Sequence, residues 1–312
     1  MLMKLITTLM LLLLTLTASS DGQKVIASGF EWAENLVFAD NAMFVSDYNA
    51  GILYKLTRSS RNTTTTKTPW ITNLTHPAGL ATAPSAPNTV FLAANSAILS
   101  VSTLVPSSFS TLTNLTAEAN GLTCADNTLY ATLEANFVPL RGSIVAIPLS
   151  APSQITAVSQ LTSPDGAYAS SALPSSPSPL IFFSEFLFHR ILAYTPSSNT
   201  SLAHVASFEA PGVDSVDDLA LFEFGMCVAD FLKSRVVLFP LSPPPNLTPG
   251  KPITLLDNLR NPTSVRMGQG PSWEQSLYVT EGGPLLSVDH NRRVWEIPLP
   301  PSLVASVAAD EA

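Results

Sequence analysis

The feature of the sequence that most constrains the fold is a group of short apolar segments and turns that recurs every 42 to 52 residues. In each copy a polar or glycine-containing start opens an apolar segment. A turn follows, then a stronger apolar segment, a second turn and a third segment. The first copy is ENLVFADNAMFVSDYNAGILYKL, Glu34 to Leu56. Equivalent positions in the six copies are Asn35, Gly79, Gly121, Gly166, Asp218 and Thr263.

A repeat of this length, built from strands without amphipathic helices, is typical of β-propeller blades. Six copies therefore predict an all-β fold, a six-bladed β-propeller occupying residues 21–312 as one domain. The segment from Gln23 to Phe30 precedes the first copy, and we expect it to close the ring by pairing with the last blade. A two-sheet β-sandwich is the alternative, but it does not account for six evenly spaced copies.

Residues 1–20 have the pattern of a secretory signal peptide. Lys4 is followed by an apolar run from Leu5 to Leu16, and the small residues Ala18 and Ser20 occupy cleavage positions. The run is shorter than the roughly 20 residues that cross a bilayer, which makes a signal anchor the less favoured alternative. We expect a protein that is secreted or stays in the secretory-pathway lumen, with no membrane segment after cleavage. Five N-glycosylation sequons agree with this route, at Asn62, Asn73, Asn114, Asn199 and Asn246.

Charge is sparse in this chain. Only 12% of residues are charged and the net charge is -8, against about 25% charged residues in a typical soluble protein. No basic patch exists, so nucleic acid is not an expected partner. We expect a monomer that binds a small-molecule substrate. Cys124 and Cys227 would allow one disulfide in an oxidising compartment, but each lies in an apolar segment of a different copy, which favours two buried free thiols.

Oxygen-bearing side chains stand at the start of the first segment in four of the six copies. The innermost strands of a propeller begin at one mouth of a central channel, so these side chains should converge near its axis. Carboxylates and amides without Cys or His suit a hard cation, and calcium accepts six to eight oxygen ligands. The alternative is ordinary turn chemistry at strand starts, but recurrence at one repeat position favours a metal or ligand site. The residues are Glu34, Asn35, Asn120, Asp165, Asp217 and Asp218.

Four of these strand starts, ENL at Glu34, NGL at Asn120, PDG at Asp165 and VDDL at Asp217, resemble those of a known superfamily. They are similar to the metal-site strand starts of the six-bladed senescence-marker-protein/gluconolactonase group, which includes paraoxonase-type lactonases and strictosidine-synthase-like proteins. The resemblance extends over the mature chain as a repeat pattern, while the matching motifs are short. It implies that Glu34, Asn120, Asp165 and Asp217 are calcium ligands, with Asn35 and Asp218 beside them.

The sequence departs from this pattern at two positions. Paraoxonase-type lactonases have a histidine immediately before the glycine of the second repeat, where this chain has Ala78, and His76 lies two residues earlier. The ligand of the fourth repeat is usually Asn in the relatives, where this chain has Asp165. The resemblance thus implies a retained metal site without the usual proton-transfer residue.

A second set of acids ends the strong segment of five copies. We interpret it as a polar turn face, with Glu185 or Glu281 as a candidate lining of the channel mouth. Together with Asn35 and the aromatic Tyr168, Glu185 completes the predicted substrate-binding set. The five acids are Asp47, Glu134, Glu185, Asp230 and Glu281.

Three functions are compatible with these patterns. The first is an enzyme acting on a small, largely apolar natural-product intermediate, by analogy with the fungal hetero-Diels-Alderase group; a cycloaddition needs positioning and a polarising donor rather than an acid or base. The second is a calcium-dependent lactonase, in which Asp165, Asp217 or Asp218 activates the water. The third is a non-catalytic secreted propeller that binds a ligand, in which calcium only stabilises the ring.

Overall fold

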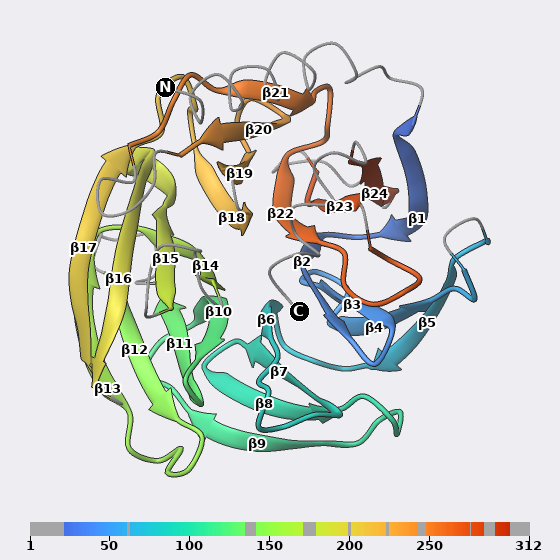
Figure 1. Cartoon of the computed structure of the whole chain (residues 1–312). Coiled ribbons are helices and arrows are strands. Elements are labelled where there is room, and N and C mark those ends of the chain that lie inside the picture. The colour runs from blue at the N-terminus through green and yellow to red at the C-terminus, as the bar shows by residue number, and fades with distance from the viewer. Residues whose placement is uncertain are drawn as a thin grey trace.

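The residues that the structure describes form 24 strands in six four-stranded antiparallel sheets, arranged as blades around a central axis (Figure 1). The structure is a computed structural model, and the prediction of an all-β six-bladed β-propeller is confirmed. It describes residues 22–60, 63–134, 142–170, 179–198, 201–222, 225–241, 248–274, 276–283 and 291–299.

Each of the first five blades uses four consecutive strands, with the first strand innermost. Blades one and two contain β2 (Ala33–Ala39), β3 (Ala42–Asp47), β4 (Ile52–Thr57), β5 (Thr66–Ile71), β6 (Pro77–Ala81), β7 (Thr89–Ala94), β8 (Ala97–Ser102) and β9 (Phe109–Asn114). Blades three and four contain β10 (Ala119–Ala125), β11 (Thr128–Leu133), β12 (Gly142–Pro148), β13 (Thr156–Leu161), β14 (Pro164–Ser170), β15 (Leu180–Glu185), β16 (Arg190–Ser198) and β17 (Ser201–Glu209). Blade five contains β18 (Val216–Phe222), β19 (Gly225–Asp230), β20 (Arg235–Pro240) and β21 (Ile253–Leu256).

The sixth blade closes the ring with a strand from the other end of the chain. Its strands β22 (Pro262–Met267), β23 (Ser276–Glu281) and β24 (Arg292–Pro298) are completed by β1 (Lys24–Phe30). β1 pairs antiparallel with β24, for example at Val25 and Trp295. The predicted closure by the N-terminal segment is therefore confirmed, and it joins the two ends of the domain.

The apolar core lies between neighbouring blades, because both faces of each sheet are covered. Six clusters of buried side chains fill the six interfaces; Phe182 of blade four, for instance, packs in one cluster with Met226 of blade five. Trp273 is fully buried between blades six and one. Cys124 and Cys227 lie in different blades and are both free thiols, as predicted, but only Cys227 is buried, while Cys124 is half-buried.

The second set of acids is not a polar turn face, and that interpretation is wrong for four of its five members. Asp47, Glu185, Asp230 and Glu281 are fully buried. Each accepts a main-chain hydrogen bond from the segment that leads into its own blade, as Asp47 does from the N–H groups of Glu31 and Trp32 at 2.9 and 2.8 Å. Their hydrogen bonds connect the segment before the inner strand of each blade to the end of its second strand.

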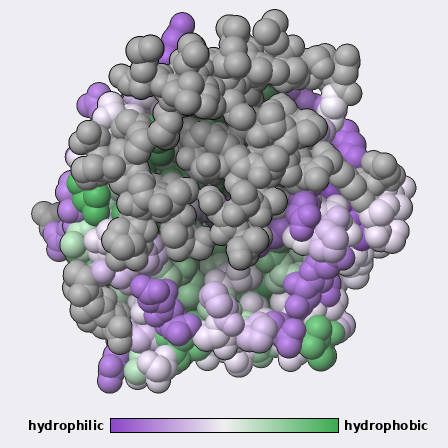
Figure 2. All heavy atoms as spheres, viewed as in Figure 1, coloured by the Kyte–Doolittle hydropathy of each residue, from purple (hydrophilic) through white to green (hydrophobic). Residues whose placement is uncertain are grey.

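On the face drawn in Figure 2, the described surface is a mixture of hydrophilic, neutral and apolar residues. Within the described ranges, no helix has the length and apolar character needed to cross a bilayer.

The inner strands approach one another so closely that side chains are excluded at several positions. A Cβ atom added to Gly166 would lie 2.5 Å from the carbonyl oxygen of Asp217, and one added to Gly121 would clash with the carbonyl oxygen of Asp165. Small residues at these points are therefore required by the packing of strands around the axis.

We expect Gly121→Ala to lower the free energy of unfolding by about 1–3 kcal/mol or more, because overpacking must move two inner strands apart. Chemical denaturation would measure the loss. Gly250→Ala is the matched control, since its nearest neighbour, the carbonyl oxygen of Pro240, is 3.2 Å from an added Cβ. Equal stability of the Gly121→Ala variant and the wild type would contradict the packing argument.

Candidate metal centre

Three carboxylates from three blades meet at one mouth of the channel. Glu34 of β2, Asp165 of β14 and Asp217 of β18 are each the second residue of an inner strand, and all are buried. One carboxylate oxygen from each lies within 4.8 Å of the other two. We call this group the carboxylate cluster. The predicted convergence of strand starts has thus been found for these three residues.

An irregularity at the start of each inner strand turns these side chains out of the sheet. The pairing of β14 with β15 shifts between Pro164 and Ala167, and β2 and β18 have the same shift at the same place. Residues within such a bulge leave the regular ladder and aim their side chains differently. This is why Glu34, Asp165 and Asp217 face the axis rather than a neighbouring blade.

Hydroxyl groups on the second strands replace the ladder bonds lost at the bulges. Ser184 Oγ accepts a hydrogen bond from the N–H of Gly166 and donates one to the carbonyl oxygen of Asp217 in the next blade, both at 2.7 Å. Thr132 bridges Gly121 and the carbonyl oxygen of Asp165 in the same way.

Thr280 donates to the carbonyl oxygen of Glu34 at 3.3 Å. The backbone of every member of the carboxylate cluster is therefore held by a hydroxyl from the preceding blade.

The electrostatics of the cluster disfavour three free charges. Burial raises the pKa of Glu34 to about 7, and the nearby charges of Glu134 and Asp218 add to this effect. Burial also raises the pKa values of Asp165 and Asp217 well above their usual range, and neighbouring carboxylates raise them further. Either protons or a cation must compensate the cluster.

The donors present fit a calcium ion. Oδ1 of Asp165 and Oδ1 of Asn35 are buried and have no hydrogen-bond partner among the described residues. Buried oxygens without partners are costly unless something else binds them. Three carboxylates and an amide oxygen are hard ligands of the kind that calcium prefers over zinc or copper.

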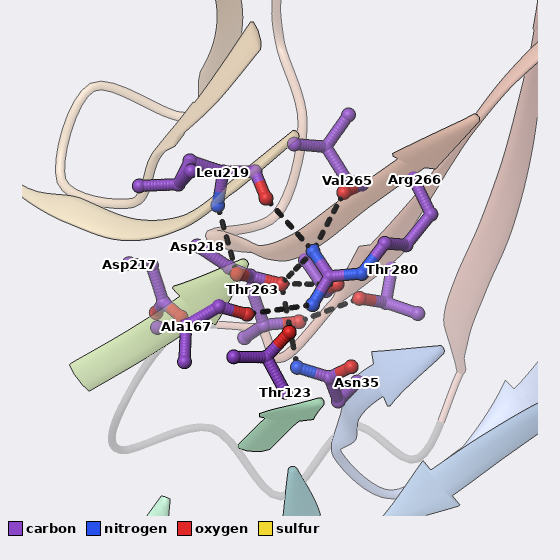
Figure 3. Close-up of polar contacts among 12 residues, drawn as sticks. Asn35, Thr123, Ala167, Asp217, Asp218, Leu219, Thr263, Val265, Arg266 and Thr280 are labelled. Carbon is purple, nitrogen blue, oxygen red and sulfur yellow. Dashed lines mark hydrogen bonds and ion pairs between the residues drawn. The ribbon is translucent and has the colours of Figure 1, made fainter. Parts of the chain in front are cut away.

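Asp218 occupies a different position from its neighbour Asp217. Its Oδ2 accepts hydrogen bonds from Ser264 at 2.6 Å, from Arg266 at 2.5 Å and from Asn35 at 3.3 Å, while Oδ1 accepts one from the N–H of Leu219 (Figure 3). Both oxygens are thus engaged. The structure makes Asp218 the anchor of a buried ion pair beside the cluster, whereas the sequence predicted a catalytic acid.

Two other predicted residues have hydrogen-bond partners of their own. The side-chain amide of Asn120 donates to Oε1 of Glu134 at 2.8 Å. Glu185 is fully buried and bound to the N–H of Thr162 and to Arg190, so it does not line the mouth.

Tyr168 lies at the other end of the inner strands. It lines a cavity of about 280 Å³ there, next to the guanidinium of Arg266, which is 5.6 Å from its ring. The two ends of the channel are therefore chemically different. Carboxylates gather at one mouth, and a neutralised arginine with apolar neighbours borders the cavity at the other.

Aromatic side chains form a shelf that begins at the cluster. Trp32 Nε1 donates to Oε2 of Glu34 at 2.5 Å. The ring of Trp32 lies 6.2 Å from that of Phe231, which lies 5.6 Å from Phe186. Leu187, Phe188 and Leu232, which follow Phe186 and Phe231 in the sequence, are exposed. Phe231 is buried, while Trp32 and Phe186 are half-buried. We call the group of Trp32, Phe186 and Phe231 the aromatic shelf.

Several residues at the two mouths were not predicted from the sequence. Glu134 was assigned to the turn face, but its carboxylate faces Asn120, and burial raises its pKa. Arg266 was not considered at all, although a charged residue in an apolar inner strand is a usable signal. Trp32 precedes its strand in an unremarkable turn, and nothing local marks it.

Two of the five sequons can be placed. Asn73 and Asn114 are exposed, as glycan acceptors must be, while Asn62, Asn199 and Asn246 lie outside the described residues. The expected signal peptide, residues 1–20, also lies outside them.

No family model and no curated protein sequence matches this chain. Solved structures do match. A luciferin-regenerating enzyme aligns over 88% of this chain and 94% of its own, with a TM-score of 0.68 and 16% identity. A calcium-binding protein, regucalcin from Agrobacterium tumefaciens strain C58, aligns over 89% and 95%, with a TM-score of 0.65 and 11% identity.

A gluconolactonase from Xanthomonas campestris aligns over 90% of this chain and 91% of its own, with a TM-score of 0.62 and 15% identity. The structural neighbours are therefore regucalcin-like and gluconolactonase-like six-bladed β-propellers, as the resemblance predicted. At these identities the likeness establishes the fold alone.

The raised pKa of Glu34 predicts how the metal-free protein responds to pH. A carboxyl whose pKa is higher in the folded state contributes stability that is present at low pH and lost as pH rises through the folded pKa. We expect the metal-free protein to melt at a lower temperature at pH 8 than at pH 5. Saturating calcium should restore stability at pH 8, by about 2.7 kcal/mol at 100 times Kd.

Calorimetry with and without a chelator would measure both effects. The control is Glu34→Gln, which cannot titrate and should flatten the pH dependence between about pH 4.5 and 7. A metal-free protein that is more stable at pH 8 than at pH 5 would contradict the account.

The hydroxyl bridges should tune the metal affinity. Ser184→Ala leaves the buried N–H of Gly166 without its acceptor and frees the backbone of Asp217, so we expect a calcium Kd about 10- to 100-fold weaker. Titration calorimetry measures this value. Ser276→Ala, which removes a buried hydroxyl that donates to Glu296 at 3.0 Å, should lower stability but leave the Kd unchanged. Equal calcium affinity of the two variants would be evidence against the bridges.

Proposed function

We propose that this chain is a calcium-dependent lactonase that hydrolyses cyclic esters bearing an apolar substituent. The observation that carries the proposal is the carboxylate cluster, buried at the channel mouth with an unpartnered Asp165 oxygen and an aromatic shelf beside it. The names of the structural neighbours, a gluconolactonase and a calcium-binding regucalcin, support the same reaction and ion.

Glu34, Asp165 and Asp217 would hold the ion, and the buried, unpartnered amide oxygen of Asn35 is a further candidate ligand. When bound, calcium polarises an ester carbonyl and stabilises the negative charge that develops on its oxygen. The residues of the chain supply the rest. Burial of the cluster removes water from around it, and in a site of low dielectric constant electrostatic interactions with the ester are stronger.

The aromatic shelf would bind the substituent of the substrate. It starts at the hydrogen bond between Trp32 and Glu34 and continues through Phe231 to Phe186. An alkyl or aryl group lying against the half-buried rings of Trp32 and Phe186, with Phe231 packed beneath, would leave the ester over the cluster. Burial of apolar area stabilises such a complex by about 25 cal/mol per Å². A substituent should therefore raise affinity in proportion to its length.

Cycloaddition, the first function predicted from the sequence, has less support. It requires an apolar site and a polarising group, but it gives no role to three carboxylates whose oxygens lie together. No comparison favours it, whereas two structural neighbours support the lactonase alternative. If no lactone reacts, the third function, a propeller that binds a ligand without turnover, is favoured. We propose further that the protein acts as a monomer along the secretory route, where calcium is plentiful.

The experiment is a lactone panel assayed with calcium and with a chelator. We expect turnover of γ- and δ-lactones with alkyl chains, and slower turnover of unsubstituted or sugar lactones. Asp217→Asn should lower kcat/KM about 10- to 100-fold. Asp257→Asn, which changes an exposed acid of another loop, should leave it unchanged. Lactone hydrolysis that persists without calcium, or no hydrolysis at all, would contradict the proposal.

A further inference from the structure

Three side chains from blades one, two and three form a contact group on the rim of the cluster's mouth. The rings of Tyr48 and His76 are stacked, with centroids 4.5 Å apart and planes at 15°. Oε1 of Glu118 lies 3.2 Å from Nδ1 of His76 and accepts a hydrogen bond from the hydroxyl of Tyr48 at 2.7 Å. We call these residues the rim triad.

The topology places the rim triad at the same mouth as the carboxylate cluster. His76 and Glu118 immediately precede the inner strands β6 and β10, and Tyr48 immediately follows β3, whose last residue pairs with the start of β2. The N–H of Tyr48 donates to the carbonyl oxygen of Trp32, two residues before Glu34. The charge of Glu118 also contributes to the raised pKa of Glu34, so the two groups influence each other.

The backbone at His76 has a conformation that recurs before an inner strand. Its φ is +43°, in the left-handed region, and Pro77 follows it. Asn261 holds the same place before Pro262 in blade six with φ of +52°. Asparagine and histidine are among the non-glycine residues enriched in this region. The conformation is therefore a feature of the turn that carries His76 to the rim of the mouth.

The contacts fix both the orientation and the tautomer of the imidazole. Nδ1–H donates to the Glu118 carboxylate in the neutral ring, which leaves the lone pair on Nε2. Stacking on Tyr48 holds the plane of the ring, and the side chain is still 50% exposed. The result is an oriented imidazole whose basic nitrogen is open to a substrate at the mouth.

We propose that His76 is the general base of the hydrolysis, oriented by Glu118 and Tyr48 as positioning residues; this inference rests on the proposed lactonase function. Nε2 accepts a proton from a water molecule while the water oxygen forms a bond to the carbonyl carbon. The bond from that carbon to the ring oxygen then breaks, and the imidazolium gives its proton to the ring oxygen. One lactone and one water give one hydroxy acid.

The mouth is therefore divided between two functions. The aromatic shelf, carried by the segments before β2 and after β15 and β19, receives the apolar part of the substrate. The rim triad, on blades one to three, faces the reacting ester and its water. The carboxylate cluster includes Glu34, which contacts the shelf through Trp32 and is influenced by the charge of Glu118.

The kinetic test compares His76→Ala with His204→Ala, which removes an exposed histidine of β17. We expect His76→Ala to lower kcat by about 10²- to 10⁴-fold, with KM little changed, and His204→Ala to match the wild type. Added imidazole should restore part of the kcat of His76→Ala. It should restore none of the activity of Glu34→Ala, which lacks a cluster carboxylate.

A measurement without substrate tests the positioning residues. Nitrogen-15 chemical shifts of the full-length protein, assigned by comparison with His76→Gln, should show the Nδ1–H tautomer of His76. Glu118→Gln should reduce the population of that tautomer, and Tyr48→Phe should change it less because the stacking persists.

The outcomes separate this inference from the proposed function. If wild-type turnover requires calcium but His76→Ala retains its kcat, or if the neutral ring carries its proton on Nε2, the inference is overturned and the lactonase stands. If the wild type hydrolyses no lactone, both are overturned.

Discussion

The site depends on hydroxyl groups that bridge one blade to the next. Each inner strand bulges where its polar side chains leave the sheet, and a bulge removes ladder hydrogen bonds from buried backbone. Ser184 and Thr132 satisfy the freed N–H groups and at the same time bind the backbone of Asp217 and Asp165 in the following blade. These hydroxyl hydrogen bonds fix one inner strand against the next. They therefore set the distances between the carboxylates that the inner strands carry.

The energetic consequence is a site that cannot hold three negative charges without protons or a cation. The three buried carboxylates, with oxygens within 4.8 Å of one another, repel each other when ionised, while neighbouring Asp218 is neutralised by Arg266. Burial raises the pKa values of all three cluster acids, so near neutral pH protons and cations compete for the same oxygens. Binding of a divalent ion would convert this repulsion into an attraction and stiffen three blades at once.

Much of the fold could be predicted from the sequence, because blade number and ring closure follow from the spacing of strands. The cluster could be predicted as well, since Glu34, Asp165 and Asp217 share a repeat position. The roles of individual acids could not be predicted, because they depend on partners from other parts of the chain. Asp218 differs from Asp217 through partners such as Arg266 and Ser264, which come from another blade. Nothing near Asp47 in the sequence indicates that its carboxylate is buried and accepts hydrogen bonds from the N–H groups of the segment before β2.

The stoichiometry of calcium binding decides whether the carboxylate cluster is a metal site. Equilibrium dialysis followed by elemental analysis should find one calcium per chain in the wild type, and Glu34→Gln, which keeps the size of the side chain and removes its charge, should lose it. Calcium bound equally by both proteins would place the ion elsewhere, and a wild type that binds none would show that the cluster is held by protons alone.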